Sequence, residues 1–131
     1  MTSITRIVVL TGLLAALSGC GGVKPVVGGT QGELRVAGAL LSDVQVTVHQ
    51  VDGNSTRPVG FAVTDIDGAF ELVTNGARGA LWLSPGEYRI TLESAGAPVQ
   101  FSQEFARAET TPLKVSWAAD DTDLEIEVAS Q

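Results

Sequence analysis

Apolar and polar residues alternate along most of the chain beyond residue 32. The clearest case is Val44, Val46 and Val48, which lie between the polar residues Gln45, Thr47 and His49. Alternation with a period of two predicts a β-strand with one buried face. The same pattern recurs with these further inward-facing positions: Leu34 and Val36; Phe61 and Val63; Phe70 and Leu72; Tyr88, Ile90 and Leu92; Leu113, Val115 and Trp117; Leu124, Ile126 and Val128.

Turn-forming residues separate these segments. They are Asp52-Gly53-Asn54, Asp67-Gly68, Asn75-Gly76, Ser84-Pro85-Gly86 and Ala95-Gly96-Ala97-Pro98. The sequence around Phe101 predicts one more short edge strand, near residues 100–105. About seven or eight short strands at roughly ten-residue spacing predict an all-β fold, an antiparallel β-sandwich over residues 33–128.

The first twenty residues have the three parts of an export signal. Arg6 gives a short, positively charged beginning, and residues 7–17 are largely apolar. This stretch is too short for a hydrocarbon core of about 30 Å, which needs about 20 residues, but it suits a signal peptide. Ser18 and Gly19 are small, as a signal peptidase requires. We therefore expect a signal peptide over residues 1–19 rather than a transmembrane anchor.

The next residue makes this interpretation more specific. Leu17-Ser18-Gly19-Cys20 resembles the bacterial lipoprotein box, in which the cysteine is lipidated and becomes the mature N-terminus. The alternative is a free buried cysteine in an exported protein that is cleaved elsewhere. An unpaired cysteine is a liability in an oxidising compartment, and Cys20 is the only cysteine of the chain. We expect a lipid on Cys20 that holds the protein on a membrane.

The residues after Cys20 predict a tether and a destination. Residues 20–32 contain five glycines and one proline, a composition typical of a flexible linker. Gly21 and Gly22 follow the lipidated position. In two-membrane bacteria an aspartate there tends to retain lipoproteins at the inner membrane, and other residues allow outward transport. The resemblance therefore implies a cell-envelope protein, on the outer membrane rather than the inner one.

The composition and net charge exclude some classes of binding partner and some kinds of site. The chain has 131 residues, enough for one ordinary domain, with 44% hydrophobic and 18% charged residues. Its formal net charge is −7, and becomes −8 when the signal peptide leaves with Arg6. Such a chain is repelled by phosphate backbones, so a nucleic-acid partner is not expected. One cysteine and one histidine exclude an intramolecular disulfide, a cysteine-rich zinc site and a His–His metal motif.

Two turn motifs carry a family resemblance. Thr64-Asp65-Ile66-Asp67-Gly68-Ala69-Phe70 matches a T-D-x-x-G-x-F hairpin, and Pro85-Gly86-Glu87-Tyr88-Arg89-Ile90 matches P-G-x-Y-x-V. A strand over residues 44–48 precedes them, and strands over 111–115 and 124–128 follow. In this order the segments resemble the transthyretin-like, or carboxypeptidase regulatory-like, domain family. With the lipoprotein box, the chain is similar to small lipoproteins of planctomycete bacteria, in which Phe105 would fill an aromatic position.

The resemblance implies a fold and almost nothing about function. One branch of the wider family, the hydroxyisourate hydrolases, has a site that resembles two histidines, an arginine and a C-terminal Y-R-G-S. Here His49 is the only histidine and the chain ends Ala129-Ser130-Gln131. That activity is therefore not expected.

Two groups of aspartates could suggest a metal. Asp65 and Asp67 resemble part of a calcium loop, but position twelve counted from Asp65 is Gly76 instead of the closing glutamate. Hydrogen bonds within the turn explain both aspartates without a metal. The second group, Asp120, Asp121 and Asp123, is expected to solvate a hairpin tip. We predict neither a metal site nor a cofactor.

Three other side chains were candidates for chemistry or binding. His49 lies on the polar face of its strand, where a solvent-exposed histidine is expected rather than a general base. An exposed Trp82 could stack on a sugar or anchor a protein. A Trp82 that folds back over the end of the core is the favoured interpretation, because large apolar groups are usually buried. Trp117 is expected in the core.

These observations lead to a functional hypothesis. The chain is expected to be a non-enzymatic, lipid-anchored accessory domain of the cell envelope, with a structural or protein-interaction role. The working surface would be a sandwich edge or a loop tip. The alternative is a carbohydrate-binding module that uses Trp82. No motif for a catalytic residue is present.

Lipidation of Cys20 has a direct test. The Cys20→Ala variant should remain unprocessed or unlipidated, because the thioether that attaches the lipid needs the thiol. Mass spectrometry of the mature wild-type N-terminus should show acyl chains on Cys20. An unmodified thiol at this position would contradict the lipoprotein interpretation.

Overall fold

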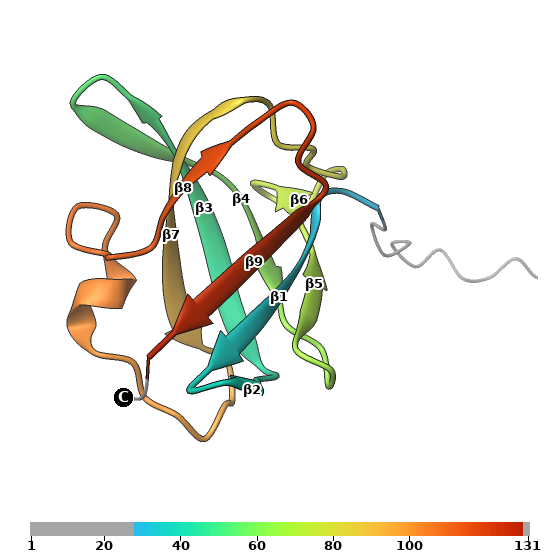
Figure 1. Cartoon of the computed structure of the whole chain (residues 1–131), viewed down its shortest axis with the longest axis vertical. Coiled ribbons are helices and arrows are strands. Elements are labelled where there is room, and N and C mark those ends of the chain that lie inside the picture. Colours follow the sequence, from blue (N-terminus) through green and yellow to red (C-terminus); the bar gives the residue numbers. More distant parts are fainter. Residues whose placement is uncertain (1–27, 130–131) are drawn as a thin grey trace, which may run out of the picture.

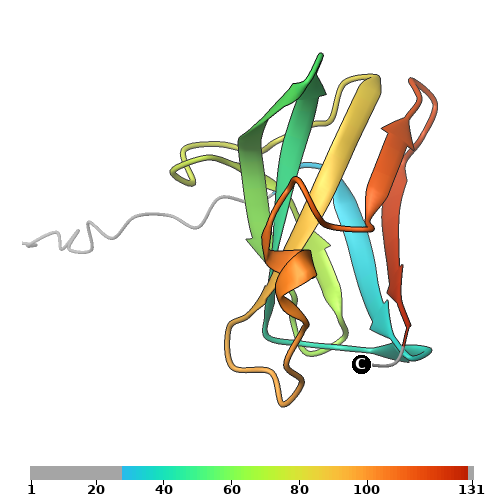
Figure 2. The ribbon, with the colours of Figure 1, turned by 90° about the vertical axis from the view of Figure 1, so that its left-hand side faces the viewer.

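Two β-sheets face each other in the computed structural model, which describes residues 28–129 (Figures 1 and 2). The described residues contain nine strands, two of them only two residues long, and one turn of 3-10 helix. The all-β sandwich expected from the sequence is therefore confirmed. The signal peptide, Cys20 and most of the expected tether lie outside the described residues.

The smaller sheet is built around β1 (Gln31–Val36). One edge of β1 pairs antiparallel with β5 (Ala69–Glu71) and with β2 (Ala39–Leu40). Its other edge pairs with β9 (Asp123–Val128). Every other strand of this sheet is thus held through β1.

The larger sheet has five strands, all antiparallel. Their order is β6 (Val73–Thr74), β4 (Ser55–Val63), β3 (Val44–Asp52), β7 (Gly86–Ser94) and β8 (Lys114–Trp117). The Pro-Gly turn opens β7 as expected, and the buried Tyr88 donates its hydroxyl to the carbonyl of Ser84 at 2.7 Å.

The core lies between the two sheets and consists of the alternating inward-facing residues. Most expected positions are confirmed, and Phe105, which belongs to the connection between β7 and β8, joins this cluster. The buried apolar strand residues of the cluster are Leu34, Val36, Val44, Val46, Val48, Ala62, Phe70, Leu72, Tyr88, Ile90, Leu92, Trp117, Leu124, Ile126 and Val128. Branched and aromatic side chains fill the space between the layers, as sandwich packing requires.

The inward face of β4 was predicted incorrectly. Phe61 is half-buried and Val63 is 47% exposed, whereas Gly60 and Ala62 are buried. Ala62 pairs with the inward-facing Val46, and cross-strand partners share a face, so Phe61 must point outward. A Cβ on Gly60 would meet the carbonyl of Val73 and the side chain of Leu81. The side chain of Leu81 thus fills the space beside Gly60 that a side chain on β4 would otherwise take.

The direction of β9 also differs from the antiparallel sandwich that was expected. β9 runs parallel to β1 over six residue pairs, from Gln31 opposite Asp123 to Val36 opposite Val128. Alternation along a strand reports which face is buried and carries no information about direction. The chain passes from β8 in one sheet to β9 in the other (Figure 2), and this crossing sets the direction.

The folded region begins earlier than the expected boundary at residue 33. Thr30 is buried, its N–H donates to the carbonyl of Leu81 at 2.8 Å, and its hydroxyl accepts the N–H of Leu83 at 2.9 Å. A Cβ on Gly29 would collide with the carbonyl of Leu72. The last residues of the expected tether are therefore part of the sandwich.

Residues 100–105 do not form the expected edge strand. They lead into η1 (Gln103–Ala106), which contains the buried Phe105. The rings of Phe101 and Phe105 pack 6.1 Å apart at 60°. In Figure 2 this turn lies in front of the larger sheet, and the Arg89 guanidinium donates to the carbonyl of Ala108 at 3.0 Å. The connection from β7 to β8 therefore covers the outer face of that sheet.

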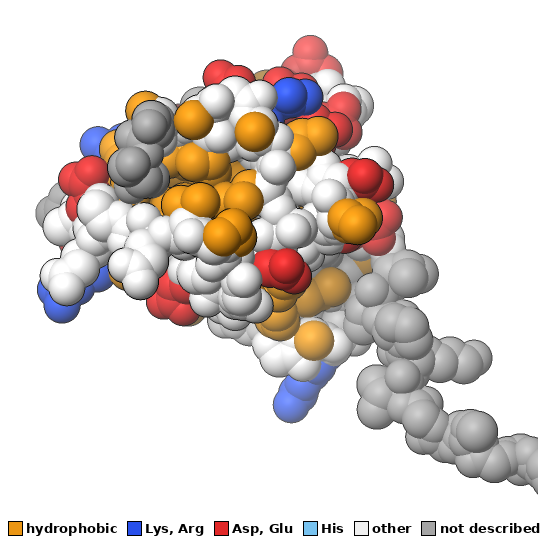
Figure 3. Space-filling model, turned by 90° about the horizontal axis from the view of Figure 1, so that it is seen from below, with side chains coloured by type: hydrophobic (Ala, Val, Ile, Leu, Met, Phe, Trp, Pro, Cys, Tyr) orange, Lys and Arg blue, Asp and Glu red, His pale blue; other side chains and the backbone are white. Residues whose placement is uncertain are grey.

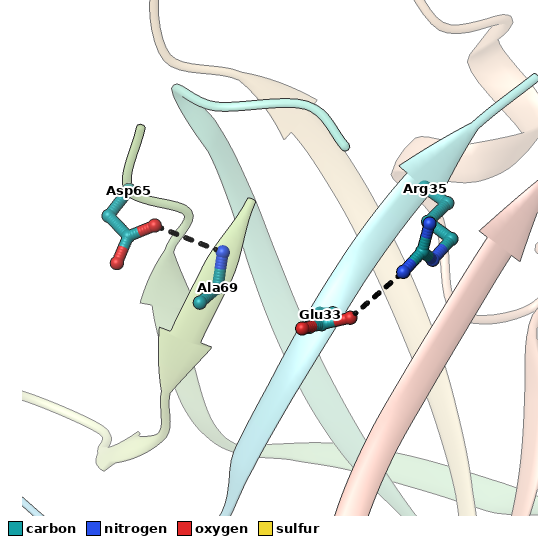
Figure 4. A network of polar contacts seen from close by, with 4 residues as sticks. All are labelled: Glu33, Arg35, Asp65 and Ala69. Atoms are coloured by element: carbon teal, nitrogen blue, oxygen red, sulfur yellow. Dashed lines mark hydrogen bonds and ion pairs between the residues drawn. The ribbon is translucent and has the colours of Figure 1, made fainter. Parts of the chain in front are cut away.

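The segment between β4 and β5 confirms the turn inferred from the Thr64–Phe70 motif but not the hairpin, because β4 and β5 lie in different sheets and do not pair. Gly68 has φ 72°, in the left-handed region that favours glycine. The Asp65 carboxylate accepts the N–H of Asp67 at 2.8 Å. It also accepts the N–H of Ala69 at 3.1 Å (Figure 4). This turn carries the chain from one sheet to the other.

A close approach at Gly32 generates a stability prediction. A Cβ there would collide with the Leu124 carbonyl and with the ring of Phe70, two groups held by the sheet and the core. The Gly32→Ala variant should lose about 1–3 kcal/mol of unfolding free energy, because overpacking forces side chains or backbone to shift. Chemical denaturation measures the loss.

Gly79→Ala is the matched control, because nothing lies within 4 Å of a Cβ at Gly79. We expect this variant to unfold near the wild-type denaturant concentration. A Gly32→Ala variant as stable as Gly79→Ala would contradict the packing of β1 against Phe70 and β9.

Candidate functional site

A hollow lies on the outer face of the smaller sheet. It has a volume of about 490 Å³ and crosses β5, β1 and β9. Its lining includes the carboxylates of Glu33, Asp65, Glu71, Asp123 and Glu125, a set called the acidic groove below. The groove arises because the outward-facing positions of three strands, far apart in sequence, meet in one sheet.

Hydrogen bonds hold several of these carboxylates in place. Glu33 pairs with the exposed Arg35 at 3.3 Å (Figure 4). Glu71 accepts the backbone N–H of Gly28 at 2.9 Å, and Asp65 bonds within its own turn. Asp123 accepts the hydroxyl of Thr122 at 3.3 Å. Four of the five carboxylates thus have a hydrogen-bond or ion-pair partner, and Arg35 is the cation that pairs with one of them in the described part of the chain.

Strand β9 forms one border of the smaller sheet (Figure 2). It pairs with β1 along one side, and within residues 28–129 no strand pairs with its other side. Asp123, Glu125 and Glu127 are exposed at alternate positions, whereas Leu124 and Ile126 point into the core. β9 is therefore a sheet edge with a carboxylate at every second residue.

His49 is not the solvent-exposed histidine that was expected. It is half-buried, and its Nε2 lies 2.9 Å from the hydroxyl of Thr91. Thr91 is itself only 5% exposed, although it lies on the outer face of β7. The β7–β8 connection that covers this face explains both observations. Burial lowers the pKa of His49 below its ordinary value of 6.5, and the negative charge of Glu109 partly opposes this shift.

The favoured interpretation of Trp82 was wrong, and that of Trp117 is confirmed. Trp82 is 68% exposed, whereas Trp117 is 7% exposed and belongs to the core cluster. The indole of Trp82 lies beside the start of the described chain, with Cζ2 3.9 Å from the position that a Cβ would take on Gly28. Its neighbours Leu81 and Leu83 are half-buried and fill the places that the tryptophan was expected to take.

The aspartate groups have structural roles. Asp65 closes the turn between β4 and β5, and Asp121 accepts the N–H of Ala118 at 2.7 Å in the turn before β9. Asp120 is exposed in that same turn. Across residues 28–129 no three His, Cys, Asp or Glu side chains are placed to hold a metal ion.

Apolar side chains gather at the end of the sandwich where β2 lies (Figure 3). Leu40 of β2 is 42% exposed, and Ile66 in the turn between β4 and β5 is 89% exposed. Leu40 packs close to Gly68, which brings the two loops together. Leu41, Ala97 and Phe101 are half-buried against the core.

The acidic groove was not anticipated from the sequence. Glu33, Glu125 and Glu127 occupy the polar positions of their strands, which predicts only that they face solvent. The signal that could have revealed them together is the pairing of β1 with β9, and no local pattern specifies that pairing. Cys20, the predicted lipidation site, lies outside the described residues.

No protein-family model and no curated protein matches this chain. In the described part of the chain, no helix is both long enough and apolar enough to cross a membrane.

The lowered pKa of His49 generates a prediction about pH. The folded state takes up this proton at a lower pH than the unfolded chain does, so between the lowered pKa and 6.5 the unfolded state binds more protons. This stability contribution is present above pH 6.5 and is lost as the pH falls through that window. The His49→Gln variant should therefore lose less thermal stability than wild type between about pH 7.5 and pH 5.

Thermal melts of both proteins at the two pH values measure this difference. Glutamine can still bond to Thr91, and the carboxylates contribute equally to both proteins. Equal losses in wild type and variant would show that burial does not disfavour the charged form of His49.

Proposed function

We propose that this chain is a lipid-anchored, non-enzymatic accessory domain of the bacterial cell envelope that binds a protein partner. The anchor is a lipid on Cys20, and the absence of aspartate after it favours the outer membrane. The β-sandwich agrees with the proposed relationship to transthyretin-like domains, a class of fold that hosts many unrelated functions. The fold alone therefore does not specify a function, and the function must be inferred from a surface of the domain.

The observation that carries the proposal is the charged edge of β9. An unpaired strand edge offers backbone N–H and C=O groups to an extended segment of another protein. A segment added to β9 would place alternate side chains beside Asp123, Glu125 and Glu127, which are exposed. Opposite charges at such cross-strand positions stabilise pairing by roughly 0.2–1 kcal/mol each.

The same charges select among partners. Pairing of β9 with a second copy of itself would bring carboxylates opposite carboxylates, and like charges in that arrangement are destabilising. The acidic groove continues the negative surface across β1 and β5. We therefore propose an extended partner segment with lysine or arginine at alternate positions.

The candidate chemical groups favour binding over catalysis. The hydroxyl nearest His49 belongs to Thr91, which is buried under the β7–β8 connection, where a substrate would have to displace the chain. A nucleophile and its base must both reach the reacting atoms. Asp65 and Glu71 are engaged in backbone hydrogen bonds that hold the fold.

The carbohydrate-binding module is the second candidate, and the exposure of Trp82 favours it. An indole that is 68% exposed offers the flat apolar face on which a sugar ring stacks. Binding on a glycan array that is lost in Trp82→Ala and kept in Glu125→Gln/Glu127→Gln would support this function over strand pairing.

Strand pairing is tested with a synthetic peptide that carries lysine at alternate positions between threonine and valine. We expect fluorescence anisotropy to show binding to the wild-type protein that weakens with salt. The Glu125→Gln/Glu127→Gln variant should bind about 3- to 10-fold more weakly, because two charge-complementary cross-strand pairs are lost.

Two controls separate strand pairing from general attraction to an acidic protein. Glu104→Gln/Glu109→Gln removes the same charge from exposed positions outside the smaller sheet and should leave the affinity unchanged. A peptide with N-methylated backbone on its pairing edge keeps its charge but cannot donate hydrogen bonds, so it should not bind. Equal affinity for both peptides, or equal effects of both double variants, would refute the β9 edge as the binding surface.

A further inference from the structure

The chain leaves the sandwich at a fixed point. Thr30 is bonded to Leu81 and Leu83, its carbonyl accepts the N–H of Leu72 at 2.9 Å, and the N–H of Gly28 is held by Glu71. Only residues 20–27 therefore remain between the proposed lipid and the folded domain. At roughly 3.3–3.6 Å per residue, these eight residues span at most about 29 Å. That is about two-thirds of the reach of the full tether expected from the sequence.

Trp82 is exposed beside this point. Its indole Cζ2 lies 3.9 Å from the Cβ position of Gly28, and the ring is 68% exposed. The backbone that carries it is fixed, because Leu81 and Leu83 bond to Thr30 on either side. The ring is thus presented to the surroundings from a rigid segment at the exit of the tether.

The loop that carries Trp82 also contains a positively charged side chain. Arg78 is exposed four residues before Trp82, in the turn that follows β6. The backbone of this turn is closed by bonds between Thr74 and Gly79 in both directions, with the N–H of Thr74 donating at 2.8 Å and the N–H of Gly79 donating to the threonine hydroxyl at 3.1 Å. In Figure 2 the loop after β6 projects sideways from the two sheets.

We infer that Trp82 and Arg78 form the domain's contact with the lipid bilayer that holds the anchor. Tryptophan rings concentrate at the headgroup level of bilayers, where one part of the ring is apolar and the N–H can bond to water or lipid. A guanidinium binds lipid phosphate with charge-assisted hydrogen bonds. This inference rests on the proposed lipidation of Cys20.

The short tether favours a bilayer over a sugar as the occupant. A lipid on Cys20 would keep this corner of the domain within about 29 Å of the membrane, so that weak contacts form at a high effective concentration. Affinity for a sugar would not be increased by a position close to the point where the tether joins the domain. Glu71 lies beside Gly28, so the surface is not strongly basic, and a bilayer with zwitterionic headgroups suffices as a partner.

The experiment uses the full, lipidated protein in phosphatidylcholine vesicles with bromine on the acyl chains near the headgroups. Bromine quenches tryptophan emission at contact, so we expect wild type to lose emission relative to the same protein in unbrominated vesicles. Trp82→Phe should abolish this loss, because the remaining Trp117 is in the core. A twenty-residue Gly/Ser insertion between Gly22 and Val23 should weaken the quenching, since effective concentration falls as a linker lengthens.

The outcomes separate this inference from the proposed function. A chain that is lipidated and bound to vesicles but unquenched at Trp82 would overturn the bilayer contact alone. An unmodified Cys20 would overturn the anchor and this inference together. Emission of Trp82 that responds to an added glycan and not to brominated lipid would assign the ring to a sugar. Quenching that the tether insertion does not weaken would also contradict the argument from reach.

Discussion

The smaller sheet depends on hydrogen bonding to a single strand. Each of β2, β5 and β9 bonds to β1, and within the described residues none of the three bonds to another of them. Gly32 lies opposite Phe70 on one side and Leu124 on the other, and its missing side chain lets that ring and that strand close over β1. The fully buried Leu34 then fixes this strand against the larger sheet. The second layer of the sandwich, and with it the acidic groove, exists because β1 is paired along both edges.

The sequence predicted those features of the fold that depend on burial of one strand face. Val44, Val46 and Val48 alternate with polar residues, and alternation is a direct record of which side chains leave water. The same reasoning failed at Phe61, since the face of a residue in a sheet is set by its partner across the ladder. The hydrophobicity of Phe61 predicted that it faces the core. Its cross-strand partner is Thr47, which is on the outer face, so Phe61 points outward. Strand direction and the β1–β9 pairing were likewise beyond local patterns.

The surfaces were harder to anticipate than the core. Asp123 was visible as part of an acidic turn, but its neighbours in space, Glu33 and Glu71, come from strands far along the chain. His49 is half-buried because the β7–β8 connection crosses the outer face of its sheet. The alternation of polar and apolar residues along a strand cannot predict that another segment covers its polar face. Trp82 was expected to fold back over the end of the core because large apolar side chains are usually buried, but Leu81 and Leu83 pack there instead. Lipidation at Cys20 stays a prediction from its sequence motif.

The parallel pairing of β1 with β9 has a consequence for the time order of folding. These strands are the first and last of the described chain, and almost all of its residues lie between them. Contacts so distant in sequence form late, because the closure of a long loop must precede any gain from pairing. Until β9 pairs, one edge of β1 has no strand partner, although β3 to β8 do not need β9 for their own pairing. The smaller sheet is therefore complete only after the final strand pairs, and a chain without β9 keeps β1, β2 and β5 but leaves one edge of β1 open and loses the buried Leu124, Ile126 and Val128 from the core.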